Sequence, residues 1–144
     1  MKPREFQDQI DDPRVVQAIT EAEKLTSGEL RVFISRHPCT DPLVAAHREF
    51  DRQGMRKTPL RNAVLFYFVP ASRQFAIAGD EGIHFRCGDV FWKDVAGEMS
   101  QLLKDGRFTD AIVAGIHRAG VEMARHFPKY PDDRDDLPNT VLRD

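Results

Sequence analysis

Two adjacent carboxylates stand between two glycines in the heptapeptide GDEGIHF, which begins at Gly79. Asp80 and Glu81 supply hard oxygen atoms, and Glu29 is a third carboxylate at the start of a strand-like run. Because Ca²⁺ and Mg²⁺ prefer hard oxygen ligands, these residue types allow a divalent-cation site. The alternative is an ordinary polar turn, in which the two glycines supply positive φ angles.

Histidine and cysteine residues offer two other kinds of chemistry. His37 with Cys39, and His84 with Cys87, have the residue types of a zinc site. The two pairs follow strands that run in opposite directions, so we expect them at opposite edges of the sheet. Cys87 is also a candidate nucleophile, because it lies near His84 and just before a predicted helix. No third orienting group is evident, which favours an unreactive thiol.

Hydrophobic periodicity predicts the helices that surround these residues. Apolar residues recur at helical spacing over residues 13–25, 41–55, 89–106 and 108–123. Asp41 followed by Pro42 is a good start signal for the second helix, and Asp89 is the expected N-cap of the third. In the first helix, Glu23 falls among the polar residues that we expect to face solvent.

Three strand-like runs complete the predicted fold. Residues 30–35 alternate in polarity, whereas residues 63–69 form the continuous apolar run that is typical of a strand covered on both faces. A turn at residues 70–73 leads to a third strand over residues 74–78, which should pair with the second strand antiparallel. The order of elements predicts the α/β class, as a three-layer α/β/α sandwich with a mixed central sheet.

This topology should bring distant polar residues together at one edge of the sheet. Strands joined by a crossover helix run parallel, so the strands that begin at Glu29 and Ala63 start at the edge where the third strand ends. Residues 26–29, 61–62 and 79–82 should therefore converge. The polar residues of this predicted edge are Thr26, Ser27, Glu29, Arg61, Asn62, Asp80 and Glu81.

Length and composition limit the possible classes of protein. The chain has 144 residues, which fits one compact domain over residues 1–127. An acidic tail over residues 128–144 should pack loosely or stay mobile. The 21 basic residues against 23 acidic ones do not give the basic footprint of a nucleic-acid-binding protein.

The expected location follows from what the sequence lacks. No segment approaches the roughly 20 apolar residues that span a bilayer, and the N-terminal residues lack the apolar core of a signal peptide. The 2 cysteines suggest no disulfide framework. We therefore expect a soluble, cytoplasmic protein that is not inserted in a membrane.

Several stretches together resemble the TPM domain, a family found in thylakoid-lumen and photosystem II repair proteins and in a modulator of acetylcholine receptors. The matching stretches are TSGELRV, RNAVLFYFV, RQFAIAGDEGIHF, FWKDV and GRFTDAIVAGI. They fall within residues 13–127, and their order agrees with the predicted sandwich. The tail is similar to that of a soluble bacterial branch of the family.

The resemblance implies a groove at one sheet edge, where acidic residues hold a divalent cation such as Ca²⁺, and, for some members, acid-phosphatase activity. Glu29 matches the acid of a Thr-Gly-Ala-Glu-like motif, and the turn over residues 79–82 matches a glycine-rich turn. Asn62 matches the asparagine of an Asp-Asn-Gly motif, whose other two positions are Arg61 and Ala63 here. A cation site would thus lose one carboxylate ligand.

These departures change the function that we predict for the edge. Arg61 should pair with Asp80 or Glu81 through its planar guanidinium, so that Glu29, Asp80 and Glu81 bind Ca²⁺ or Mg²⁺ weakly or not at all. We therefore favour a non-catalytic binding or assembly module, whose partner is a protein such as a membrane or assembly protein. A metal-dependent phosphatase is the alternative.

Overall fold

The computed structural model of the protein describes residues 9–129 and 139–144. Within these residues the chain forms α-helices, two short 3-10 helices and β-strands. They are α2 (Asp12–Leu25), β1 (Glu29–Ile34), α3 (Pro42–Arg52), η1 (Met55–Lys57), β2 (Ala63–Val69), η2 (Pro70–Ser72), β3 (Gln74–Gly79), α4 (Glu81–Cys87), α5 (Asp89–Lys104), α6 (Phe108–His126) and β4 (Val141–Arg143).

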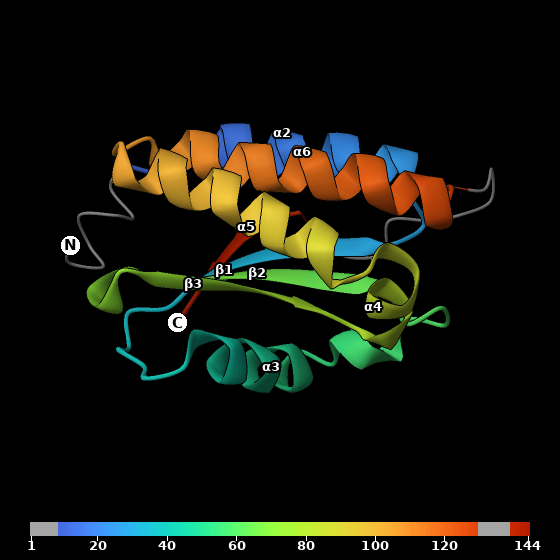
Figure 1. Ribbon diagram of the computed structural model, residues 1–144, viewed down its shortest axis with the longest axis horizontal. Coiled ribbons are helices and arrows are strands. Elements are labelled where there is room, and N and C mark those ends of the chain that lie inside the picture. The colour runs from blue at the N-terminus through green and yellow to red at the C-terminus, as the bar shows by residue number, and fades with distance from the viewer. Residues whose placement is uncertain (1–8, 130–138) are drawn as a thin grey trace.

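The strands form one mixed sheet in the order β3, β2, β1, β4. β1 runs parallel to β2, with Glu29 opposite Ala63, and β3 runs antiparallel to β2, with Gly79 opposite Val64. Figure 1 shows α2, α5 and α6 on one face of the sheet and α3 on the other. The predicted three-layer α/β/α sandwich with a mixed sheet is confirmed.

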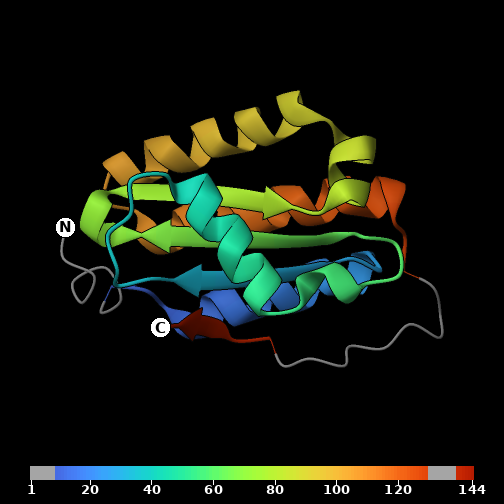
Figure 2. The same cartoon turned by 90° about the horizontal axis from the view of Figure 1, so that it is seen from below.

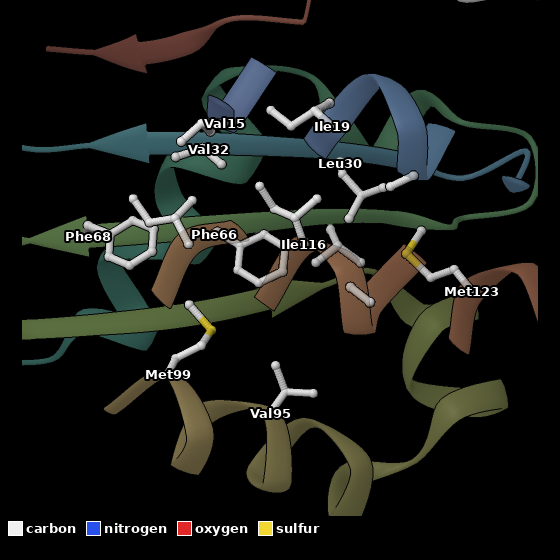
Figure 3. Packing of buried hydrophobic residues seen from close by; sticks show 14 of the residues in the cluster. Val15, Ile19, Leu30, Val32, Phe66, Phe68, Val95, Met99, Ile116 and Met123 are labelled. Carbon is white, nitrogen blue, oxygen red and sulfur yellow. The ribbon is translucent and has the colours of Figure 1, made fainter. Parts of the chain in front are cut away.

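Each face of the sheet packs against its own hydrophobic core. On the face covered by α2, α5 and α6, Phe66 lies near Met99 and Ile116 (Figure 3). On the other face, Leu65 packs in a cluster that includes Phe50 of α3. Every residue of β2 is buried, which explains why its sequence is apolar throughout.

Two helix boundaries differ from the prediction and one agrees with it. The Asp41 carboxylate accepts hydrogen bonds from the first turn of α3, and Pro42 is the first helical residue, as predicted. That helix ends at Arg52 and is followed by the short helix η1. The N-cap of α5 is Gly88, with φ of 77°, so Asp89 is the first residue inside the helix and not its cap.

Glu23 does not face solvent, which corrects the prediction from helical periodicity. Its side chain is buried, and its Oε2 atom accepts a hydrogen bond from the Leu30 backbone N–H at 3.1 Å. The pairing of β1 with β4 begins only at Val32. Glu23 therefore accepts a hydrogen bond from a backbone N–H of β1 that precedes the residues paired with β4. The amphipathic pattern of the helix alone does not reveal this role.

The end of the predicted tail belongs to the sheet. β4 pairs parallel with β1 at its outer edge, where Figure 2 shows the two strands side by side. The Asp144 carboxylate accepts a hydrogen bond from Ser35 Oγ at 2.6 Å, and the Arg143 guanidinium donates two hydrogen bonds of 2.9 Å to the Asp12 carboxylate. These contacts tie the last residues to both β1 and α2.

The expectation of a loosely packed or mobile tail is therefore wrong for residues 139–144. It failed because a strand of only three residues carries too little periodic pattern to be recognised. Residues 130–138 lie outside the described residues, and the division of the chain after residue 127 stays a prediction.

We expect Val141→Asp to destabilise the domain, because it places a charge on a half-buried strand position that packs against the core. Its midpoint of thermal unfolding should fall by about 8 °C, which corresponds to ~2 kcal/mol at this chain length. Thr140→Asp, at the exposed neighbouring position, is the matched control and should shift the midpoint by less than about 2 °C. Equal melting of the two variants would show that β4 contributes nothing to stability.

Candidate functional site

Three backbone hydrogen bonds join the segments that were predicted to converge. The Glu29 N–H donates to the Asn62 carbonyl at 3.3 Å, and the Asp80 N–H donates to the Ala63 carbonyl at 3.0 Å. The Gly82 N–H donates to the Arg61 carbonyl at 2.9 Å. The predicted convergence of residues 26–29, 61–62 and 79–82 is therefore confirmed. We call this region the carboxylate edge; it comprises those three segments.

The GDEG segment is the start of a helix and not a simple turn. Asp80 is the N-cap of α4, and its Oδ1 atom accepts a hydrogen bond from the Glu81 N–H at 2.8 Å. Neither Gly79 nor Gly82 has a positive φ, so the interpretation that these glycines supply one is wrong. The acidic pair thus begins the helix with charges that suit its N-terminal dipole.

The two glycines are required by close packing. A Cβ atom at Gly82 would lie 2.3 Å from the Leu60 carbonyl oxygen and 2.7 Å from that of Arg61. A Cβ atom at Gly79 would lie 2.8 Å from Cγ2 of Ile83. At position 82, only a residue without a side chain lets α4 approach the loop before β2 this closely.

Arg61 binds the Asp80 carboxylate through two nitrogen atoms of its guanidinium group. Its Nε and Nη2 atoms each donate a hydrogen bond of 2.7 Å to Asp80, and Nη1 lies 3.6 Å from Oε2 of Glu81. The predicted pairing through the planar fork is thus confirmed. The Asp80 side chain is 4% exposed and that of Arg61 35%, so the pair is screened by solvent on the arginine side only.

The electrostatic environment keeps both partners charged. Burial of Asp80 favours its neutral form, but hydrogen bonds from Arg61 and the Glu81 N–H, and the nearby positive charges, outweigh this and lower the pKa of Asp80. The hydrogen bond to Asp80 is the main cause that raises the pKa of Arg61. At neutral pH the carboxylate is therefore ionised and already neutralised by a fixed cation.

The neutral residues of the carboxylate edge have structural partners. Buried Thr26 donates from Oγ1 to the Phe127 carbonyl at 2.5 Å, and the Ser27 N–H donates to the same carbonyl at 2.9 Å. Nδ2 of buried Asn62 donates to Ser27 Oγ at 3.3 Å. These contacts connect the end of α6 to the starts of β1 and β2.

Glu29 lies at the carboxylate edge but pairs with a different cation. Its Oε1 atom accepts a hydrogen bond from Arg31 Nε at 2.9 Å, and Arg31 also donates to Gln53 at 2.8 Å. Within the described residues, no group of three or more histidine, cysteine or acidic side chains is placed to hold a metal ion. Cation binding by Glu29, Asp80 and Glu81 stays a prediction.

The histidine and cysteine residues form no shared site in the described chain. His37 and Cys39 follow the end of β1, whereas His84 and Cys87 lie on α4 at the opposite end of the sheet, as expected from the topology. Cys87 is the last residue of α4 and directly precedes Gly88, the N-cap of α5, so it lies just before a helix as predicted. Burial, and then the charge of Glu122, raise the pKa of Cys87 to about 11 against the opposing charge of Arg125.

Comparison with known proteins assigns the chain to a family. The family model of the TPM domain matches residues 7–122. The chain belongs to the TPM domain family. No curated protein matches significantly.

Two solved structures are similar to this TPM domain. The NMR structure of BA42 from the psychrophilic bacterium Bizionia argentinensis is 37% identical, covers 92% of both chains and superposes with a TM-score of 0.85. The N-terminal domain of cg2496 from Corynebacterium glutamicum is 18% identical, covers 81% of this chain and 75% of its own, and has a TM-score of 0.61. The second likeness concerns the fold alone.

Sequence reasoning missed the exposed apolar residues of the TPM domain beside the carboxylate edge. Phe85 of α4 is 83% exposed, and Val90 in the first turn of α5 is 82% exposed. Leu60, next to Arg61, is also exposed. The sequence could have predicted α4 from Asp80, because aspartate is a favoured N-cap residue and this one directly follows a strand.

We expect Gly82→Ala to destabilise the TPM domain by about 2 kcal/mol or more, because the new methyl group meets two backbone carbonyl oxygens that cannot rotate away. Gly97→Ala is the matched control, since nothing lies within 4 Å of its Cβ position in the middle of α5. That change should stabilise the domain by about 0.5–1 kcal/mol. Denaturant unfolding measures both, and a neutral Gly82→Ala would disprove the close contact.

Proposed function

We propose that this TPM domain is a non-catalytic module that binds another protein at the carboxylate edge. The observation that carries the proposal is the exposure of Phe85 and Val90, at 83% and 82%, on the helices that adjoin this edge. Large apolar side chains exposed this fully are favourable contact points for a partner, because their burial on binding releases water. An exposed aromatic residue is also a frequent anchor of protein interfaces.

Charged groups lie close to Phe85 on α4. The Arg86 guanidinium lies 5.6 Å from the centre of the Phe85 ring, and the Glu81 side chain is 79% exposed. Arg61 remains one-third exposed although it pairs with Asp80. An apolar centre with a charged rim is the composition of a specific interface. The expected partner therefore presents apolar side chains flanked by charges of both signs.

The geometry of the carboxylate edge favours binding over the alternative, a metal-dependent phosphatase. Both oxygens of Asp80 already accept hydrogen bonds from Arg61 at 2.7 Å. A metal ion would have to displace this arginine or share the carboxylate with it. The raised pKa of Cys87, to about 11, also leaves that thiol protonated and a poor nucleophile.

A photocrosslinking experiment tests the proposed interface. We expect p-benzoylphenylalanine in place of Phe85, in the full chain within its source cells, to give a discrete crosslinked protein. The same group in place of Leu43, which is 47% exposed on α3, is the control and should not give it. The same product from both positions, or none from position 85, would contradict the proposed interface.

The phosphatase alternative predicts a different result. The purified chain should then hydrolyse an aryl phosphate in a reaction that requires Ca²⁺ or Mg²⁺ and is lost in Asp80→Ala. We expect no such turnover.

We expect Arg61→Asp to create Ca²⁺ binding that the wild-type chain lacks or has only weakly. The change removes a competing charge and places a third carboxylate near Asp80 and Glu81, whose repulsion a cation would relieve. Arg61 has φ of 53°, a conformation that aspartate and asparagine also adopt, so Arg61→Asn is the matched neutral control.

Calorimetric titration with Ca²⁺ compares the three forms. Arg61→Asp should bind at least about tenfold more tightly than Arg61→Asn, a difference of ~1.4 kcal/mol. Tight binding by the wild-type chain, or equal binding by the two variants, would show that Arg61 does not occupy the position of a ligand.

A further inference from the structure

A cavity of about 460 Å³ lies at the end of the sheet opposite to the carboxylate edge. It is formed where the β2–β3 hairpin meets the end of α5 and the start of α6, and Figure 1 shows this hairpin and α4 at opposite ends of the sheet. Its lining residues are Phe68, Pro70, Arg73, Gln74, Phe75, Ser100, Leu103, Lys104, Gly106 and Phe108. The volume falls in the range of small-molecule sites, roughly 300–1,000 Å³.

Aromatic and aliphatic side chains provide most of the lining. Phe68 and Phe75 stack with their ring centres 5.8 Å apart and their planes inclined by 22°, so they present a flat apolar wall. Leu103 of α5 and Phe108 at the start of α6 add further apolar surface. A bound molecule would therefore bury an apolar body in this cavity.

Both charged residues of the lining are cations. Arg73 follows η2, and Lys104 is the last residue of α5, so the two charges come from different elements. No acidic residue lines the cavity, and within the described part of the chain neither Arg73 nor Lys104 has a side-chain ion pair. An anionic ligand would supply the missing counter-charge.

The backbone at Arg73 supports a role for this residue. Arg73 has φ of 52°, in the left-handed region that glycine and asparagine adopt more readily. Its N–H donates to the Pro70 carbonyl at 3.0 Å, which closes the hairpin turn. A glycine would fit this turn with less strain but would contribute no charge to the cavity.

We propose that this cavity binds a small amphipathic anion, with an apolar body against the phenylalanine rings and one carboxylate between Arg73 and Lys104. Arg73 can receive the carboxylate with two parallel hydrogen bonds, while Lys104 acts as a point charge. The site is independent of the proposed protein interface, because the length of β2 separates it from the carboxylate edge.

Titration followed by ¹⁵N–¹H NMR spectroscopy tests the proposal on the full chain. Decanoate represents an acyl chain and 1-naphthoate an aromatic acid, so the two probes distinguish the sources of such an anion. Decyltrimethylammonium has a chain of nearly the same length as decanoate and the opposite charge. We expect at least one of the two acids to shift the amide signals of residues 68–75 and 100–108, and the cation to leave them unchanged.

Variants test separately whether binding depends on the two positive charges and on the open volume of the cavity. Arg73→Asn combined with Lys104→Gln should weaken binding of the acid by about tenfold or more, as expected for the loss of charge-assisted hydrogen bonds. Lys93→Gln, an exposed cation elsewhere on α5, is the matched control and should bind as the wild-type chain does. Ser100→Phe, which fills the cavity and keeps both cations, should also abolish binding.

Three outcomes would overturn the proposal. These are no shift with either acid at millimolar concentration, equal shifts with the cation, or unchanged affinity in the Arg73→Asn, Lys104→Gln variant. Thermal melting of each variant establishes that it is folded before its affinity is compared. If the double variant were unfolded, the comparison of Ser100→Phe with the wild-type chain would decide.

Discussion

The close approach of Gly82 to the loop before β2 is the constraint on which the carboxylate edge depends. With no side chain between them, the Gly82 N–H reaches the Arg61 carbonyl at 2.9 Å, and this contact fixes the start of α4 against the start of β2. Asp80 then lies at the helix N-terminus within reach of the Arg61 guanidinium. The position of the helix thus determines which groups meet, and the ion pair is a consequence of backbone packing.

Arg61 adopts an unusual backbone conformation because several contacts hold it there. Its φ of 53° is uncommon for a long side chain, yet its N–H donates to the Thr58 carbonyl and its own carbonyl accepts from Gly82. The two hydrogen bonds of its guanidinium to Asp80 add a further restraint. Arg61 stands where the resemblance implied an aspartate, so this part of the edge is a neutralised ion pair beside one exposed acid, Glu81.

The topology was predictable from the sequence because the long helices and the three main strands each carry a clear apolar pattern between turn residues. The crossover helix predicts that β1 and β2 are parallel, and this pairing brings Asn62 and Asp80 to one edge of the sheet. Short elements could not be recognised in this way: α4 has one buried apolar residue, Ile83, and β4 has three residues. The buried role of Glu23 also depends on where a neighbouring strand begins, which no local pattern contains.

The two ends of the sheet differ in how their positive charges are used, and this difference bears on what each end can bind. At the carboxylate edge, Arg61 is paired with Asp80, so few charges are left for the proposed protein partner, and the proposal assigns much of the contact to the exposed Phe85. At the hairpin end, Arg73 and Lys104 border an apolar cavity that has no acid in its lining. The first arrangement suits a protein surface, whereas the second suits a small anion that inserts its apolar part. The buried β2 lies between the two ends, and the lining of the cavity shares no residue with the carboxylate edge.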